Sequence, residues 1–411
     1  MNRDRKNYFA HALEGGLFMG GMAFLAADTV LTVMAQQLGA PNWLIALLPT
    51  AMFAGLVMAP IMTASFIERS RSMKRITLFT GVPQRAVFLV AGIVIIVWGD
   101  DHPGYALAAL ALAPVLSGVF GGIGQGAWVQ LVARTVPANR RSSLTATRNL
   151  IAACIGLGAG LVIKRVLDEH DGAIGFGILH LIAFGFLAAS YIAFLSIQEN
   201  IVEPVKTTRQ RSLKAYFIEL IDILRVDRDF RYFALMRVTG PAASFLIPFM
   251  TIYAIRVLGA SEGFAGDALV AATLGQFVGN IGAGYMGDRL GGKALLVWAR
   301  VLFLGAFLFA AFAQSYAAFM AYFFIISATN FVNIIGNMTL MMEIAPDHKR
   351  PTYGALAGLL NGPSMILFAL AGSFLWTKFD SMQLQALIAS IGMLFSLFFI
   401  CQVKDPRNAK G

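Results

Sequence analysis

Charged residues are scarce in this chain of 411 residues. Asp, Glu, Lys and Arg together make up 13% of it, roughly half of what soluble proteins carry. Hydrophobic residues make up 58%, and the mean hydropathy is +0.70. So few charges cannot keep so apolar a chain in water. The composition therefore excludes a soluble enzyme, a disordered scaffold and a small disulfide-rich secreted domain.

Cysteine is almost absent. Cys154 and Cys401 both lie inside apolar runs, and no CxxC spacing is present. We therefore expect no disulfide and no metal site. We also expect no cofactor, and the absence of a P-loop argues against a transporter driven by ATP.

Long apolar runs, by contrast, are abundant. A membrane-spanning helix needs about 20 mostly apolar residues, and the sequence offers twelve such runs. They cover 12–38, 43–67, 76–98, 105–133, 143–164, 173–197, 232–257, 267–287, 293–313, 316–341, 354–377 and 383–402.

The basic residues give an independent test of this count. With the N-terminus inside the cell, 27 of the 32 Lys and Arg fall on the cytoplasmic side and only four on the outside. Cytoplasmic loops are enriched in these residues. The net charge of +10 is therefore explained by basic loops rather than by nucleic-acid binding. We expect a multi-pass protein of the plasma membrane (the inner membrane in a bacterium) with both termini in the cytoplasm.

A polar stretch divides the chain into two halves, 1–197 and 232–411, joined by a linker at 198–231. Within the linker we expect an amphipathic helix on the cytoplasmic surface, because apolar residues share one helical face: Leu213, Phe217, Leu220, Ile221 and Leu224. The alternative is an unstructured linker. Pro137 and Pro346, 209 residues apart, each begin a loop with two basic residues, which indicates a duplicated six-helix unit.

One loop is specific. The residues Gly284, Asp288, Arg289, Gly291 and Lys293 resemble the GxxxDRxGxK signature of the major facilitator superfamily. A degenerate copy in the first half contains Glu68 and Arg69. The resemblance implies an all-α membrane protein with twelve transmembrane helices in two pseudo-symmetric six-helix bundles. It also implies a secondary transporter in which these loops form a conformational latch. The alternative is an ordinary charged turn.

In this loop Gly284 would let its helix approach a neighbour closely, and Gly291 would permit the turn. Asp288 would pair with nearby arginines or cap a helix. Other signatures of the family are poor: Gly122 stands where the RxxQG motif has arginine, and the fifth span lacks the proline of the antiporter motif.

Asp28 lies over halfway along the first span. Charged groups inside the membrane are costly and are functional candidates, so we expect Asp28 to take part in proton coupling or solute binding. A structural hydrogen bond, or a place near the outer vestibule, is the alternative. Arg85 and Arg300 lie in spans that are peripheral in the family, so we expect them to snorkel or to pair with loop acids.

Polar side chains inside several other spans are candidates for solute binding. The alternative role for such residues is hydrogen bonding between helices. The candidates are Gln125, Trp128, Gln276, Asn280, Asn330, Asn333, Asn337 and Asn361. Arg148 and Asn149 begin the fifth span and are candidates for a cytoplasmic gate.

We therefore expect a monomeric secondary transporter that moves a small organic solute by alternating access, with coupling to protons. An amide-rich cavity favours a neutral polar or hydroxylated solute over an organic phosphate. An efflux antiporter for amphiphilic compounds and a membrane sensor without transport activity remain alternatives.

Overall fold

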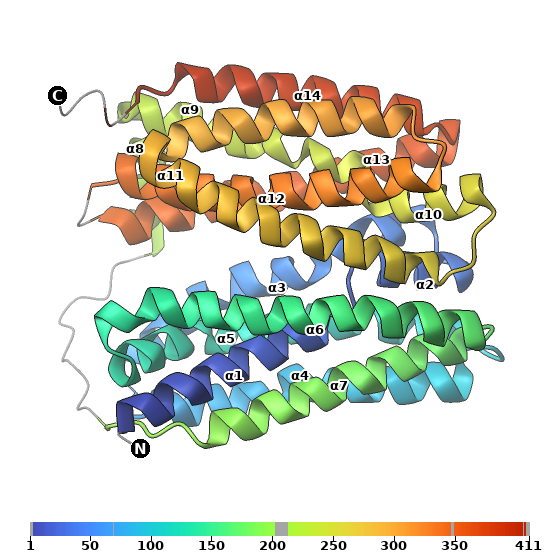
Figure 1. Ribbon diagram of the computed structural model, residues 1–411. Helices are drawn as coiled ribbons and strands as arrows, with labels where there is room; N and C mark the ends of the chain where they lie inside the picture. The colour runs from blue at the N-terminus through green and yellow to red at the C-terminus, as the bar shows by residue number, and fades with distance from the viewer. Residues whose placement is uncertain (1–2, 69, 202–212, 347–348, 406, 408–411) are drawn as a thin grey trace. The chain divides into compact units, whose positions relative to one another are not determined.

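The computed structural model describes the chain except for residues 1–2, 69, 202–212, 347–348, 406 and 408–411 (Figure 1). Every regular element of the described residues is helical. The chain divides into two compact units, Met1–Thr208 with Ala260–Val270 and Arg209–Gly259 with Ala271–Gly411.

The first unit contains seven helices. In it α5 packs against α3 and α4, α7 packs against α4, and α1 packs against α6 and α7. The helices are α1 (Arg3–Ala23), α2 (Val30–Gln37), α3 (Asn42–Glu68), α4 (Met73–Trp98), α5 (Pro103–Thr135), α6 (Arg141–Glu169) and α7 (Ala173–Leu195), with a short 3-10 helix η1 (Ala138–Arg140) before α6.

The second unit repeats this plan. Its first membrane segment, α9 with the 3-10 helix η2, packs against α13 and α14, as α1 packs against α6 and α7. The elements are α8 (Leu213–Val226), α9 (Arg228–Thr239), η2 (Gly240–Phe245), α10 (Ile247–Leu258), α11 (Phe264–Ala311), α12 (Tyr316–Ile344), α13 (Arg350–Phe379) and α14 (Met382–Gln402).

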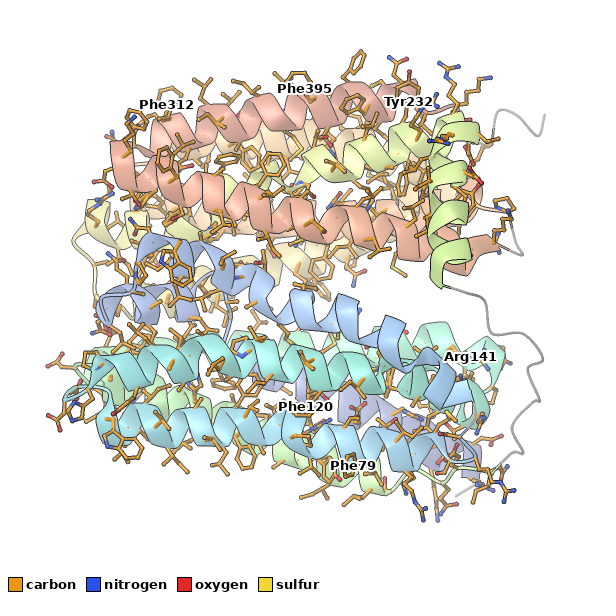
Figure 2. The ribbon with its side chains drawn as sticks, turned by 180° about the vertical axis from the view of Figure 1, so that it is seen from behind. Phe79, Phe120, Arg141, Tyr232, Phe312 and Phe395 are labelled. Atoms are coloured by element: carbon orange, nitrogen blue, oxygen red, sulfur yellow. The ribbon has the colours of Figure 1, made fainter. Side chains whose placement is uncertain are left out.

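Nine helical segments among the described residues are long and apolar enough to cross a membrane. One of them, α11, covers two predicted spans, and α1 with α2 and α3 cover two more, so the architecture is consistent with twelve spans. Large apolar side chains project outward (Figure 2): Phe79, Phe312 and Phe395 are 81%, 80% and 56% exposed. Such surfaces are unfavourable in water and suit lipid.

Three spans are less regular than expected. The first is broken between α1 and α2, where Phe24 and Ala26 close turns by bonding to Gly21 and Ala23 carbonyls at 3.2 and 3.3 Å. The seventh is interrupted at η2, where Pro241 has no N–H to continue the helix. In α11 the loop expected between the eighth and ninth spans consists of a single non-helical residue, Gly291, with φ of +83°.

The linker helix α8 covers the predicted segment, but its contacts differ from those expected. Leu220 and Ile223 are buried in a core cluster with Phe230 of α9 and Tyr353 of α13, whereas Ile221 is 49% exposed. Leu220 and Leu224 of the predicted face pack against the second unit, and Ile223 takes the place expected of Ile221. The side chains of Leu213 and Phe217 lie outside the described residues.

Candidate functional site

A buried carboxylate lies between two arginines in the first unit. Glu14 of α1 is 6% exposed. Arg85 of α4 donates from Nη2 to Glu14 Oε1 at 3.4 Å. Arg148 of α6 brings its Nη2 to 3.7 Å from Glu14 Oε2. Three helices thus place one negative and two positive groups at one point, where burial makes their attraction strong.

The neighbouring residues hold both arginines in place. Arg148 lies over the ring of Trp128 at 4.5 Å from its centroid, a cation–π contact. A Cβ on Gly15 would overlap the guanidinium of Arg148, so the glycine makes room for it. Arg85 is tied to α7: its Nε donates to the Leu187 carbonyl at 3.1 Å and its Nη2 to Ser190 Oγ at 3.2 Å.

The second unit contains a buried arginine in a matching place. Arg300 of α11 is 2% exposed. Its Nε donates to Ser396 Oγ of α14 at 2.7 Å and its Nη1 to Asn333 Oδ1 of α12 at 2.7 Å. Arg85 with Ser190 and Arg300 with Ser396 join the third span to the sixth and the ninth to the twelfth. The duplication thus extends to the buried polar contacts.

Two of the predicted amides on α12 belong to this network. Asn337 Nδ2 donates to the Asn333 carbonyl at 2.7 Å and to Asn333 Oδ1 at 2.9 Å. Asn330, on the same predicted face, is exposed. The expectation for Arg300, snorkelling or pairing with loop acids, is wrong, because its partners are neutral groups inside the unit.

The other candidates are dispersed. Asp28 lies in the break between α1 and α2 and is exposed, as is Gln125. Gln276, Asn280 and Asn149 are half-buried. Asn361 donates from Nδ2 to Met365 Sδ at 3.1 Å, and its carbonyl accepts from Ser364 Oγ at 2.8 Å. The structure joins Trp128 to Arg148 and Asn333 to Asn337.

The signature loop of the second unit is held by two residues that the sequence analysis did not single out. Arg407 donates from Nη2 to the Gly287 carbonyl and from Nη1 to the Asp288 carbonyl, each at 3.0 Å. Glu343 accepts from Arg407 Nε at 3.0 Å and from the Gly292 N–H at 3.1 Å. Among the described residues, the Asp288 carboxylate makes no hydrogen bond or ion pair. Arg407 and Glu343 therefore anchor the loop through its backbone.

The remaining residues of this loop differ in their surroundings. Arg289 is exposed and stacks on Tyr285 at 4.1 Å from the ring centroid, and Lys293 is half-buried. A Cβ on Gly284 would meet no atom within 4 Å, so the close approach expected there is absent. In the degenerate copy, Arg69 and the side chain of Glu68 lie outside the described residues.

Glu14 could have been found by the argument applied to Asp28, because it also lies within the first apolar run. Because Glu14 lies close to the polar N-terminus, the sequence did not distinguish it from the charged residues before the first span. Arg237 is one of the 27 basic residues that the sequence assigns to the cytoplasmic side, although it lies in the third turn of α9. The pairing of Glu14 with Arg85 and Arg148 depends on contacts among three helices and has no signature in the sequence.

The sequence is similar to those of known proteins. The family model described as Major Facilitator Superfamily matches residues 232–411. Uncharacterised proteins of Mycobacterium tuberculosis and Mycobacterium bovis are 22% identical over 312 residues. The match covers 75% of this chain and 59% of each relative, so the chain spans only about three fifths of their length.

Several solved structures share the fold. A nucleoside transporter has a TM-score of 0.74 at 12% identity, with 98% of this chain and 100% of that chain covered. A D-xylose–proton symporter has a TM-score of 0.70 at 14% identity, with 96% and 97% covered. A bacterial homologue of the iron transporter ferroportin, in an inward-facing state, has a TM-score of 0.68 at 12% identity, with 98% and 99% covered.

Proposed function

We propose that the chain is a transporter of the major facilitator superfamily that moves a small organic solute by alternating access, with coupling to protons. The family model matches its second half, and its fold resembles those of solved transporters, which supports this proposal. The observation that carries the proton coupling is the position of Glu14 between Arg85 and Arg148. A titratable carboxylate in the interior of a helical bundle gives a transporter a place to carry a proton.

The chemistry of such a site follows from its charges. With Glu14 ionised, the carboxylate attracts both guanidiniums and ties α1 to α4 and α6. Protonation removes that negative charge and leaves two arginines that repel each other and no longer face a charged partner. The contacts among three helices therefore depend on one proton, which is what coupling requires.

Asp28 is the second candidate for the coupling group. It lies where the first span departs from helical geometry, between Ala23 and Val30. Such breaks leave backbone groups available to a solute or ion where they face a cavity. Its exposure in the structure favours a role in the entry of a proton or solute.

The remaining features of the proposal concern the setting of the protein. The distribution of basic residues supports a position in the plasma membrane with both termini in the cytoplasm. That the protein is a monomer stays a prediction. Arg148 would contribute to closure on the cytoplasmic side, because it lies in the first third of α6 and its contact with Glu14 joins that part of α6 to the middle of α1.

The test is transport in liposomes. Purified protein is reconstituted with a pH-sensitive dye inside, and a panel of nucleosides, sugars, peptides and organic acids is screened for solute-dependent proton flux. The direction of that flux distinguishes symport from antiport, and hence import from export. Absence of flux, or of counterflow, for every solute would contradict the proposed function.

The coupling residue is identified with matched variants. Glu14→Gln should abolish accumulation driven by a pH gradient and retain solute counterflow, which needs no proton movement. Asp28→Asn is measured in parallel, and Glu169→Gln, which removes an exposed acid paired with Arg165 at 2.8 Å, serves as the control. Gradient-driven accumulation by Glu14→Gln equal to wild type would exclude Glu14 as the coupling group.

A further inference from the structure

Two interior arginines of the second unit form no ion pair with an acid among the described residues. In the candidate spans of this unit, acids lie only near the ends or beside the turn at Gly291: Asp229, Asp288 and Glu343. The stretches between them, 230–258, 271–287, 294–342, 350–379 and 382–402, contain no Asp or Glu. Five arginines lie within these stretches. Arg231, Arg256 and Arg350 lie at or near the ends of the stretches, whereas Arg237 of α9 and Arg300 of α11 lie further inside. The first unit is different, because both of its interior arginines face Glu14.

Arg300 is the fixed member of the pair. Its three hydrogen-bonded partners are Ser396 Oγ, Asn333 Oδ1 and Met236 Sδ, the last at 2.6 Å from Nη2. All three partners are neutral. They orient the guanidinium but do not cancel its charge.

Arg237 is the available member. It follows Met236, whose Sδ contacts Arg300, and a Cβ on Gly240, three residues after Arg237, would lie 3.4 Å from Arg300 Nη2. The two arginines are therefore neighbours, and their like charges repel. Among the described residues its guanidinium has no hydrogen bond or ion pair, and its Nε is buried without a partner. The residue as a whole is half-buried.

Local dipoles compensate for only part of this charge. Helix α9 ends at Thr239, and the C-terminal end of a helix carries roughly half a negative charge. That leaves more than one positive charge in an apolar layer, where an unpaired charge is strongly unfavourable. A bound anion would remove that cost.

We propose that Arg237 and Arg300 form the binding site for an anionic group of the transported solute, a carboxylate or a phosphate. This inference rests on the transport function proposed above and names its substrate class. A guanidinium presents paired N–H donors that match the oxygens of both groups. Arg237 makes the direct contact, and Arg300 supplies the second charge.

The same site selects for a further polar group on the solute. Asn337 Oδ1 is buried and has no hydrogen-bond donor among the described residues, although its Nδ2 is bonded to Asn333. A hydroxyl or N–H group beside the anion would donate to it. The class is thus a hydroxylated or amino-bearing organic anion, in contrast to the neutral solute expected from the amides alone.

The test measures the melting temperature of the purified full chain in a non-ionic detergent at constant ionic strength. The anionic probes are acetate, succinate, gluconate and inorganic phosphate, each at about 10 mM. The matched neutral probes are acetamide, succinamide and glucitol. An anion that binds with a dissociation constant of about 0.1 mM should raise the melting temperature by at least about 3 °C, and its neutral partner should not.

Four variants test whether the rise in melting temperature comes from binding at this site. Arg237→Gln should lower the apparent affinity at least about tenfold, and Arg237→Lys should recover part of it. Arg225→Gln, which removes an exposed arginine from α8, should behave as wild type. Without ligand, Arg237→Met should melt no lower than wild type, because it removes an uncompensated charge.

The outcomes separate this inference from the proposed function. Stabilisation by none of the anions, or stabilisation that survives both Arg237→Gln and Arg300→Gln, overturns the anion site. A melting temperature that falls sharply in Arg237→Met also overturns it, because Arg237 would then have a structural partner. Arg237-dependent stabilisation without any flux in liposomes supports the site and contradicts the transport function. Flux of neutral solutes that is unaffected by Arg237→Gln supports the transport function and contradicts the anion site.

Discussion

Arg134 Nη1 lies 3.1 Å from Glu199 Oε1, and this ion pair joins the end of α5 to the segment after α7. Glu343 and Arg407 join the end of α12 to the segment after α14 in the same way, at 3.0 Å. The residues are 209 and 208 positions apart in the two halves, and the signs of the charges are exchanged. Both units therefore have an ion pair at this position, but the acid and the base have exchanged places between them.

Each pair anchors the loop that precedes the third span of its half. In the first unit Glu199 accepts from Ser72 Oγ at 2.8 Å and from the Met73 and Lys74 N–H groups at 2.9 Å each. It therefore caps the N-terminus of α4 as well as pairing with Arg134. A carboxylate is favoured there by the helix dipole.

Glu199→Ala should destabilise the protein by about 3 kcal/mol, because it leaves three donors and a partly buried arginine without their acceptor. Glu199→Gln keeps one oxygen and should lose less. The measurement is thermal unfolding in detergent, with Glu169→Ala as the exposed control. Equal melting temperatures for Glu199→Ala and Glu169→Ala would contradict the anchoring role.

The second pair can be tested by exchanging its charges. Arg407→Glu places two acids together and removes the donors to the Gly287 and Asp288 carbonyls, so hydrogen exchange at Gly287–Lys293 should accelerate. Adding Glu343→Arg restores an ion pair of the polarity found in the first unit and should recover much of the protection. Arg289→Glu, which alters an exposed residue of the same loop, is the control. If the double variant recovers no protection, an ion pair with the charges exchanged cannot replace the native pair of Glu343 and Arg407.

Gly291 and Gly284 belong to the same signature but should respond differently to alanine. Gly291 has φ of +83°, and a Cβ there would lie 2.8 Å from Arg407 Nε, so Gly291→Ala should cost about 1–3 kcal/mol. Gly284→Ala meets open space inside a helix and should be neutral or stabilising by up to about 1 kcal/mol. The two variants are compared by thermal unfolding. A larger loss for Gly284→Ala would mean that a close contact forms at Gly284 in another conformation of the protein.

Much of the architecture was predictable because the membrane imposes a simple rule on sequence. The apolar run predicted at 173–197 became α7 at Ala173–Leu195, and the run at 383–402 became α14 at Met382–Gln402. The irregular elements were missed for local reasons. The break after Ala23 contains no proline, and Gly291 lets α11 pass through a turn with a single non-helical residue.

The candidate sites were less predictable, because they depend on which helices meet. Asn333 and Asn337 share a helical face, so their joint role could be read from spacing. Their partner Arg300 comes from another helix, and Glu14 finds Arg85 and Arg148 on two others. Such contacts between helices, and the unbalanced charge of Arg237, emerge only when burial and partners are known.

Glu262 gives a prediction for pH outside the membrane-spanning helices. It lies between α10 and α11, and burial raises the pKa of its carboxyl. A hydrogen bond with Gln37 lowers that pKa, and the charge of Asp171 raises it further. The folded protein therefore holds this proton more tightly than the unfolded chain, in which a glutamate has a pKa of about 4.3.

The sign of the effect follows from that difference. The stabilisation from protonated Glu262 is fully present below about pH 4.3 and is lost as the pH rises through the higher pKa of the folded state. The melting temperature of wild type relative to Glu262→Gln should therefore increase on acidification through this interval, while the exposed-acid control Glu169→Gln shows no such trend. A difference that shrinks on acidification would mean that Glu262 is stabilised as the carboxylate, through a cationic partner, and that burial does not govern its ionisation.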